Sequence, residues 1–146
     1  MRGLVIIRHE AVQRNIVGTI LTSLEEKGFK LVAIKMVTAR RDQAEALYAH
    51  LKDKPFYEGI LQCMMDGPFI AIAVEMPPGI DLYASLTQWK GISGLRGRFA
   101  THASRNVIHG SSSAQDAQRE VSLFFSDDEI CAYTKAVDAW LGEGTQ

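Results

Sequence analysis

Three apolar runs separated by more polar segments predict three strands in the first half of the chain. The runs are Leu4–Ile7, Leu31–Val37 and Phe69–Val74. Apolar residues at helical spacing fill the intervals between these runs and predict three amphipathic helices. The helices are expected over about 15–27, from Asp42 to Leu51, and from Pro55 to Gly67.

The second half of the chain has a weaker pattern. Residues 80–86 are weakly helical, and residues 90–105 contain three glycines and look like a loop. Ser112 or Ser113 is suited to cap a short helix that runs through Glu120. Val121–Phe125 is predicted to be the fourth strand. A C-terminal helix is expected after it, with Ile130, Tyr133, Val137 and Trp140 on its apolar face.

This order of elements predicts an α/β fold of the α+β sandwich type, with the βαββαβ pattern of ferredoxin-like proteins. The four-stranded sheet would be antiparallel and would carry helices on one face. The other face would be covered by the remaining helices or by a partner subunit. The length of 146 residues suits a single domain spanning 1–146.

Composition narrows the classes of function. The net charge is −1, so no overall basic field favours nucleic acid, and a nucleic-acid partner is not expected. No apolar run approaches the length needed to cross a membrane, so no membrane partner is expected either. Two cysteines, Cys63 and Cys131, are too few for a disulfide framework and fit a reducing, cytoplasmic setting.

The most informative segment is Arg105–Ser111, which places His109 beside a glycine and a serine. A neutral imidazole is a nucleophile near pH 7, and arginine is suited to grip phosphate. Glu120 is a candidate to fix the imidazole tautomer. Each residue also has a structural interpretation, since a histidine beside a Gly-Ser turn is usually a loop residue and a helical glutamate is usually on the surface.

Further candidates gather around a phosphate-binding function. Arg96, Arg98 and Arg105 could clamp a polyphosphate, although an arginine run is usually a solvated loop. Phe56 follows Pro55 in a turn, where an exposed ring could stack on a base. An aromatic residue there is more often part of the core, and Arg8 and Tyr48 taken alone are more often structural.

Five segments together carry a resemblance to the nucleoside diphosphate kinase family, from near residue 3 to near residue 140. The Asn-Val-Ile-His-Gly-Ser string is the most specific of the shared features. The segments are Ala11–Arg14, Glu26–Ala33, Lys54–Gly59, Arg96–Phe99 and Arg105–Ser111.

The resemblance implies a ping-pong transfer of the terminal phosphate from a nucleoside triphosphate to a nucleoside diphosphate, through a phosphohistidine on His109. It implies Mg²⁺ bound with the nucleotide, little base selectivity and a homo-oligomer, as a hexamer, tetramer or dimer. By this resemblance, Glu120 would orient the histidine and Tyr48 would lie beside it. Phe56 and Ile60 would form an apolar clamp on the base. Arg96 and Arg105 would contact the phosphates, and Asn106 would contact the ribose.

The sequence departs from the family around the phosphates. Arg8-His9-Glu10 stands where the family has Lys-Pro-Asp, so Arg8 keeps the charge at the end of the first strand but not the compact ammonium. A simple register places Ala84 where a phosphate-binding arginine is expected, and Ser112 where aspartate is usual. Lys90 and Arg98 are candidates to replace the missing cation.

Three hypotheses follow. The leading one is an active nucleoside diphosphate kinase, at full or reduced rate. The second is a kinase-like protein that binds nucleotide, has weakened or lost catalysis, and serves a regulatory or interaction role. The third, a ferredoxin-like nucleic-acid binder, ranks last because the aromatic pair expected on its sheet strands is missing.

Overall fold

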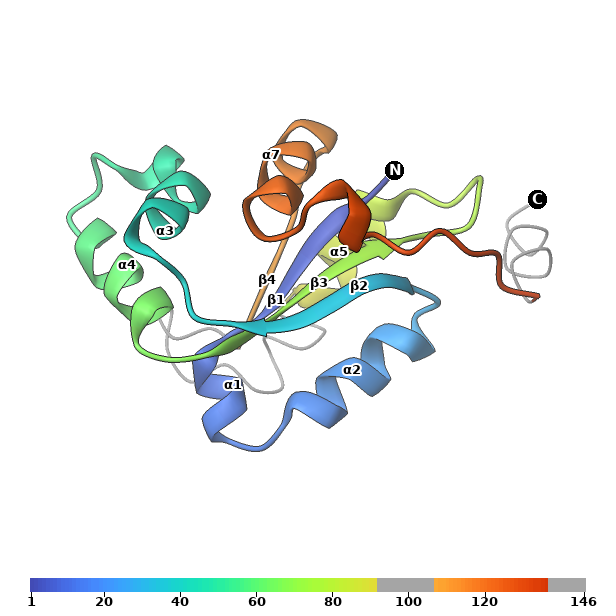
Figure 1. Ribbon diagram of the computed structural model, residues 1–146, viewed down its shortest axis with the longest axis horizontal. Helices are drawn as coiled ribbons and strands as arrows, with labels where there is room; N and C mark the ends of the chain where they lie inside the picture. The colour runs from blue at the N-terminus through green and yellow to red at the C-terminus, as the bar shows by residue number, and fades with distance from the viewer. Residues whose placement is uncertain (92–106, 137–146) are drawn as a thin grey trace.

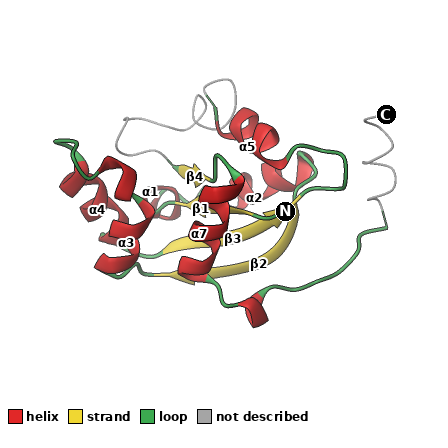
Figure 2. Ribbon diagram, turned by 90° about the horizontal axis from the view of Figure 1, so that it is seen from above, coloured by secondary structure: helices red, strands yellow, loops and turns green. Residues whose placement is uncertain are grey.

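Strand β1 (Gly3–Ile7) has every residue buried, as an apolar run flanked by two other strands requires. A computed structural model describes residues 1–91 and 107–136 of the chain (Figure 1). The other strands are β2 (Lys30–Val37), β3 (Phe69–Glu75) and β4 (Ile108–Gly110). The sheet has the order β2-β3-β1-β4 with antiparallel neighbours throughout (Figure 2), which confirms the ferredoxin-like prediction.

Three helical segments in the first half of the chain lie where the apolar periodicity predicted helices, whereas the short helix His9–Gln13 was not predicted. Helix α2 ends before Gly28, whose φ of 96° suits glycine because other residues rarely adopt it. The helical elements are α1 (His9–Gln13), α2 (Val17–Glu26), α3 (Arg41–Leu47), η1 (Ala49–Leu51), α4 (Tyr57–Met65), α5 (Leu82–Lys90), α7 (Ala114–Phe124) and η2 (Asp127–Glu129).

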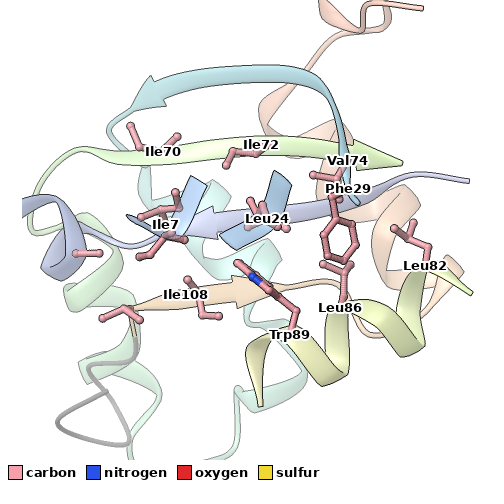
Figure 3. Close-up of a cluster of buried hydrophobic side chains, with 14 residues drawn as sticks. Ile7, Leu24, Phe29, Ile70, Ile72, Val74, Leu82, Leu86, Trp89 and Ile108 are labelled. Carbon is pink, nitrogen blue, oxygen red and sulfur yellow. The ribbon is translucent and has the colours of Figure 1, made fainter. Parts of the chain in front are cut away.

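Two apolar clusters hold helices on both faces of the sheet. Figure 3 shows the first, in which Leu24 of α2 and Leu86 and Trp89 of α5 pack on Ile7 and Ile108. The second lies on the opposite face, where side chains of α3, α4 and α7 pack on β1 and β3. Figure 1 shows α3 and α7 above the sheet and α2 below it. The remaining helices therefore cover the second face, one of the two expected possibilities.

The predicted fourth strand, Val121–Phe125, is wrong. Residues 121–124 are the last turn of α7, and Phe125 is its C-terminal cap. The buried residues of α7 are Ala117, Glu120 and Phe124, and this spacing of three and four is helical rather than alternating. The fourth strand is instead β4, which lies within the histidine motif.

The predicted C-terminal helix is also wrong in its described part. After η2, the chain from Ile130 to Ala136 contains no helix or strand. It follows β2, since the Cys131 N–H donates to the Val32 carbonyl at 2.8 Å and the Tyr133 hydroxyl donates to the Leu31 carbonyl. Val137 and Trp140 lie outside the described residues. Among the described residues, no helix is long and apolar enough to cross a membrane.

Candidate active site

Strand β4 fixes the direction of the His109 side chain. His109 lies opposite Ile6 of β1 in the antiparallel register. Its neighbour Ile108 packs into the cluster with α2 and α5 (Figure 3), and successive side chains of a strand point to opposite faces. His109 therefore faces the side of the sheet that carries α3, α4 and α7.

Glu120 of α7 reaches His109 on that face. His109 Nε2 and Glu120 Oε1 are 3.2 Å apart, with 17% of the imidazole side chain and 4% of the glutamate side chain exposed. Helix α7 begins after Ser113, whose hydroxyl accepts the Asp116 N–H. Glu120 lies about two turns beyond this cap, on the inward side of the helix. The two predicted partners are thus brought together.

Ser111 completes the polar group, and no role was predicted for it. Its hydroxyl donates to Glu120 Oε2 at 2.6 Å and accepts from the Leu4 N–H at 2.9 Å. Both oxygens of Glu120 are therefore bound by protein donors. The Gly-Ser pair of the motif was the available signal, but the partners of the hydroxyl depend on how α7 and β1 meet β4.

These contacts set the charge of Glu120 and the tautomer of a neutral His109 ring. Burial alone would raise the pKa of the Glu120 carboxyl, but hydrogen bonds from His109 and Ser111 and the nearby positive charge of Arg119 hold it below its ordinary value of 4.5. The carboxylate is ionised at neutral pH and only accepts hydrogen bonds. His109 Nε2 must then carry the hydrogen, so the lone pair of the neutral ring lies on Nδ1.

Tyr48 borders the imidazole, and Arg8 lies near the segment that precedes His109. Tyr48, the C-terminal cap of α3, is 7% exposed, and its ring meets the His109 ring edge-on with centroids 6.1 Å apart. Arg8 follows β1, and its backbone N–H donates to the Val107 carbonyl at 2.8 Å. Arg8 therefore lies at the end of β1, beside the segment that leads into β4.

The remaining predicted residues divide into two groups. Phe56 occupies the N-cap position of α4 and is 48% exposed, and Ile60, partly buried against the second apolar cluster, lies one turn further along on the same side of the helix. Arg96, Arg98, Arg105 and Asn106 lie outside the described residues. Within the described part of the chain, no group of three or more His, Cys, Asp or Glu residues is placed to hold a metal ion.

The fold and the site together are typical of a protein that transfers a group through a histidine side chain. A ferredoxin-like sheet presents an imidazole with a nucleophilic Nδ1, held from behind by a buried carboxylate and a serine. Such a group is suited to covalent transfer through histidine.

Comparison with known proteins identifies the family. The family model for nucleoside diphosphate kinase matches residues 1–130. The nucleoside diphosphate kinase of Archaeoglobus fulgidus is 40% identical over 97% of both chains, and that of Carboxydothermus hydrogenoformans is 36% identical over 97% of this chain and 99% of its own. A solved Halobacterium salinarum nucleoside diphosphate kinase in complex with CDP aligns over 97% of both chains with a TM-score of 0.89 and 32% identity.

The chain therefore belongs to the nucleoside diphosphate kinase family. Membership makes it a phosphotransferase enzyme that acts on nucleotides. The leading hypothesis from the sequence is confirmed at this level, and the comparisons do not favour a protein that has lost catalysis.

Proposed function

We propose that His109 carries the phosphoryl group between nucleotides in a ping-pong reaction. His109 Nδ1 attacks the terminal phosphorus of a nucleoside triphosphate, an N–P bond forms, and the bond from phosphorus to the bridging oxygen breaks. The nucleoside diphosphate leaves with that bonding pair. A second diphosphate then attacks the phosphohistidine and restores the neutral ring. The observation that carries the proposal is the Nε2 contact to ionised Glu120, which leaves Nδ1 as the nucleophile.

Glu120 is assigned a catalytic role because it touches the reacting ring. The ring becomes cationic as Nδ1 bonds to phosphorus while Nε2 keeps its hydrogen. A carboxylate with 4% of its side chain exposed is screened little by water and stabilises this charge. Its two hydrogen bonds hold the carboxylate in place before the reaction begins, so little reorganisation is needed.

The nucleotide is proposed to lie between α4 and the end of β1. Phe56 and Ile60 would hold the base through apolar contact, which accepts any base because every base has a π-face. Arg8, Arg96 and Arg105 would hold the phosphates, Asn106 the ribose, and Tyr48 would support the His109 ring. The CDP complex of the Halobacterium salinarum relative supports a nucleoside diphosphate as one substrate.

Mg²⁺ is proposed to enter as part of the nucleotide substrate. Glu120 is the acidic side chain nearest His109 in the sequence-predicted site, and both of its oxygens are engaged by His109 and Ser111. It therefore offers no free oxygen for a metal. Phosphate oxygens and water would supply the ligands, as Mg²⁺ prefers, and the ion would share the phosphate charge.

The protein is further proposed to act as a single cytoplasmic domain, residues 1–146, in a homo-oligomer. Cys63 and Cys131 are free thiols, as expected in a reducing compartment. The edge strand β2 exposes 51% of Ile34 and 59% of Met36, and a second copy of the chain would cover them. The minimal assembly is a dimer, from which a tetramer or hexamer could be built.

The oligomer is tested by analytical ultracentrifugation of a Met36→Lys variant. A charge at this position should release the partner and lower the sedimenting mass. Gln62→Lys, which adds the same charge at an exposed position of α4, should leave the mass unchanged. A Met36→Lys protein with the mass of the unaltered protein would show that β2 is not the interface.

The chemical proposal is tested by mixing the protein with γ-labelled ATP. An acid-labile phosphoenzyme should form and should be discharged by a nucleoside diphosphate. His109→Ala should abolish the label, whereas His50→Ala, at an exposed histidine, should retain it. Equal labelling of His109→Ala and the unaltered protein would exclude His109 as the carrier.

A further inference from the structure

Lys90, a candidate phosphate contact from the sequence, is buried within the protein. Apart from aromatic rings, the buried polar or charged side chains of the described residues are Lys90, Ser111 and Glu120. Ser111 and Glu120 form the group that holds His109. Lys90 reaches the same stretch of chain from the opposite face of the sheet. Because a buried charge is costly unless it is well bonded, this convergence calls for a physical explanation.

The Lys90 side chain is fitted closely to the residues after His109. It is the last residue of α5 and is 9% exposed. Its Nζ donates to the Gly110 carbonyl at 2.6 Å and to the Ser112 hydroxyl at 3.3 Å. Its stem lies on Gly110, where an added Cβ would come within 3.4 Å of Lys90 Cδ. The glycine of the His-Gly-Ser motif thus leaves room for the lysine.

A short path of bonds leads from Lys90 to the nucleophile. The Gly110 carbonyl that Lys90 binds belongs to the peptide plane that also contains the Ser111 N–H. That N–H donates to the Leu4 carbonyl at 3.0 Å, so the plane is held from two sides. The Ser111 hydroxyl orients Glu120, and Glu120 orients His109. A rotation of this peptide would move the serine hydroxyl and loosen the carboxylate.

We propose that Lys90 is a positioning residue for phosphoryl transfer: it locks the Gly110–Ser111 peptide so that Ser111 and Glu120 hold His109 with Nδ1 ready to attack. The inference rests on the proposed role of His109. It differs from the expectation that Lys90 replaces a missing phosphate contact, because the ammonium has two acceptors within the protein itself.

The two roles predict different kinetics. A phosphate contact contributes mainly to nucleotide binding, so its loss would raise the nucleotide Kd. A positioning residue contributes to the rate at saturating nucleotide, because a small displacement of reacting groups can cost about 100-fold in rate. Loss of the Lys90 ammonium should therefore slow phosphoenzyme formation about 10- to 100-fold and change the ADP Kd by less than about twofold.

The experiment compares the unaltered protein with Lys90→Met, which keeps most of the apolar stem, and Lys90→Gln, which keeps a shorter donor. Rapid-quench labelling with saturating γ-labelled ATP gives the phosphorylation rate, and calorimetry gives the ADP Kd. Nitrogen NMR of ¹⁵N-histidine protein reports the His109 tautomer, with the signal assigned by its loss in His109→Ala. In the unaltered protein the hydrogen should lie on Nε2, and in Lys90→Met part of it should move to Nδ1.

The outcomes separate the positioning role from its alternatives. Slow labelling, a nearly unchanged Kd and a shifted tautomer support it, with Lys90→Gln intermediate in rate. An unaltered phosphorylation rate in Lys90→Met overturns it, and a raised ADP Kd together with an unaltered rate at saturating ATP also overturns it. If Lys90→Met does not fold, an unaltered rate in Lys90→Gln overturns it. A failure of the unaltered protein to label on His109 would instead contradict the proposed function itself.

Discussion

Replacement of Glu120 by glutamine tests how the structure prepares His109 for attack. The change keeps the shape of the side chain but removes its charge. At neutral pH the buried carboxylate accepts the Nε2 hydrogen at 3.2 Å, and a hydrogen bond to a charged group contributes about 1.5–3 kcal/mol. Two unit charges about 4 Å apart interact by about 4 kcal/mol at an effective dielectric of 20. If the imidazole ring carries about half of a positive charge in the transition state, its attraction to Glu120 is about 2 kcal/mol, within the range given by the hydrogen bond. Because about 1.4 kcal/mol corresponds to tenfold, phosphorylation should slow about 10- to 150-fold.

A change of the His109 tautomer in this variant places the expected loss of phosphorylation rate near the upper end of that range. Ser111 accepts the Leu4 N–H, so its own hydrogen is directed at residue 120. In Glu120→Gln this hydroxyl would bind the amide oxygen and leave the amide NH₂ facing His109 Nε2. Nε2 would then accept, the ring hydrogen would move to Nδ1, and the nucleophile would be blocked.

The assay is rapid-quench labelling with saturating γ-labelled ATP, with thermal unfolding measured in parallel. Asp116→Asn is the matched control, because it makes the same chemical change on the exposed side of α7, where Asp116 pairs with Arg119. This control should label at the rate of the unaltered protein. A Glu120→Gln rate within twofold of the unaltered protein, or an equal fall in Asp116→Asn, would refute the reasoning.

Two further predictions concern the frame of the site. Phe124 is 4% exposed and meets Phe69 edge-on, so Phe124→Ala should lower the free energy of unfolding by about 3–5 kcal/mol in urea, whereas exposed Ser122→Ala should change it by less than about 0.5 kcal/mol. Equal effects would contradict the helical direction of Phe124. A hydrogen bond from the Ser126 backbone N–H, and a weaker effect of the Lys35 ammonium, lower the pKa of Glu129 from 4.5 to about 2. Ionised Glu129 therefore contributes to stability above about pH 4.5, and this contribution is lost as the pH falls toward 2. Glu129→Gln should therefore be less stable than the unaltered protein at pH 7, and a difference that persisted undiminished at pH 2 would contradict the assignment.

The first half of the fold could be predicted because its pattern is strong. β1 and β3 are continuous apolar runs and α2 is amphipathic, and the burial of each agrees with its sequence pattern. The second half misled because local signals conflict with packing. Val121–Phe125 is rich in strand-favouring residues, but the helix that begins at Ser113 continues through it to Phe124. β4 is only three residues long and contains His109 and Gly110, so no period could reveal it.

The C-terminal residues show a related ambiguity. Ile130 and Tyr133 are spaced as in a helix, yet the described segment follows β2 and satisfies the Val32 and Leu31 carbonyls of that edge. The unpaired backbone groups of an edge strand can bind another segment of the chain, and the sequence of that segment does not indicate such binding. The same holds for Lys90, which is 20 residues away from the carbonyl it binds.

The candidate site could be predicted as a set of residues but not as a geometry. The resemblance named His109, Glu120 and Tyr48, and the structure brings these three together. The support from Ser111 depends on where α7 meets β1 and β4. Contacts of this kind arise from tertiary packing, so they become visible only when the elements are placed in space.

The most direct test of the central claim is to determine which nitrogen of His109 carries the phosphoryl group. Phosphoenzyme prepared from ¹⁵N-histidine protein and ATP can be studied by phosphorus and nitrogen NMR, in which the coupled nitrogen identifies the bond. The Glu120 contact to Nε2 predicts phosphorus on Nδ1 and a hydrogen retained on Nε2. Phosphorus on Nε2, or on a residue other than His109, would contradict the account.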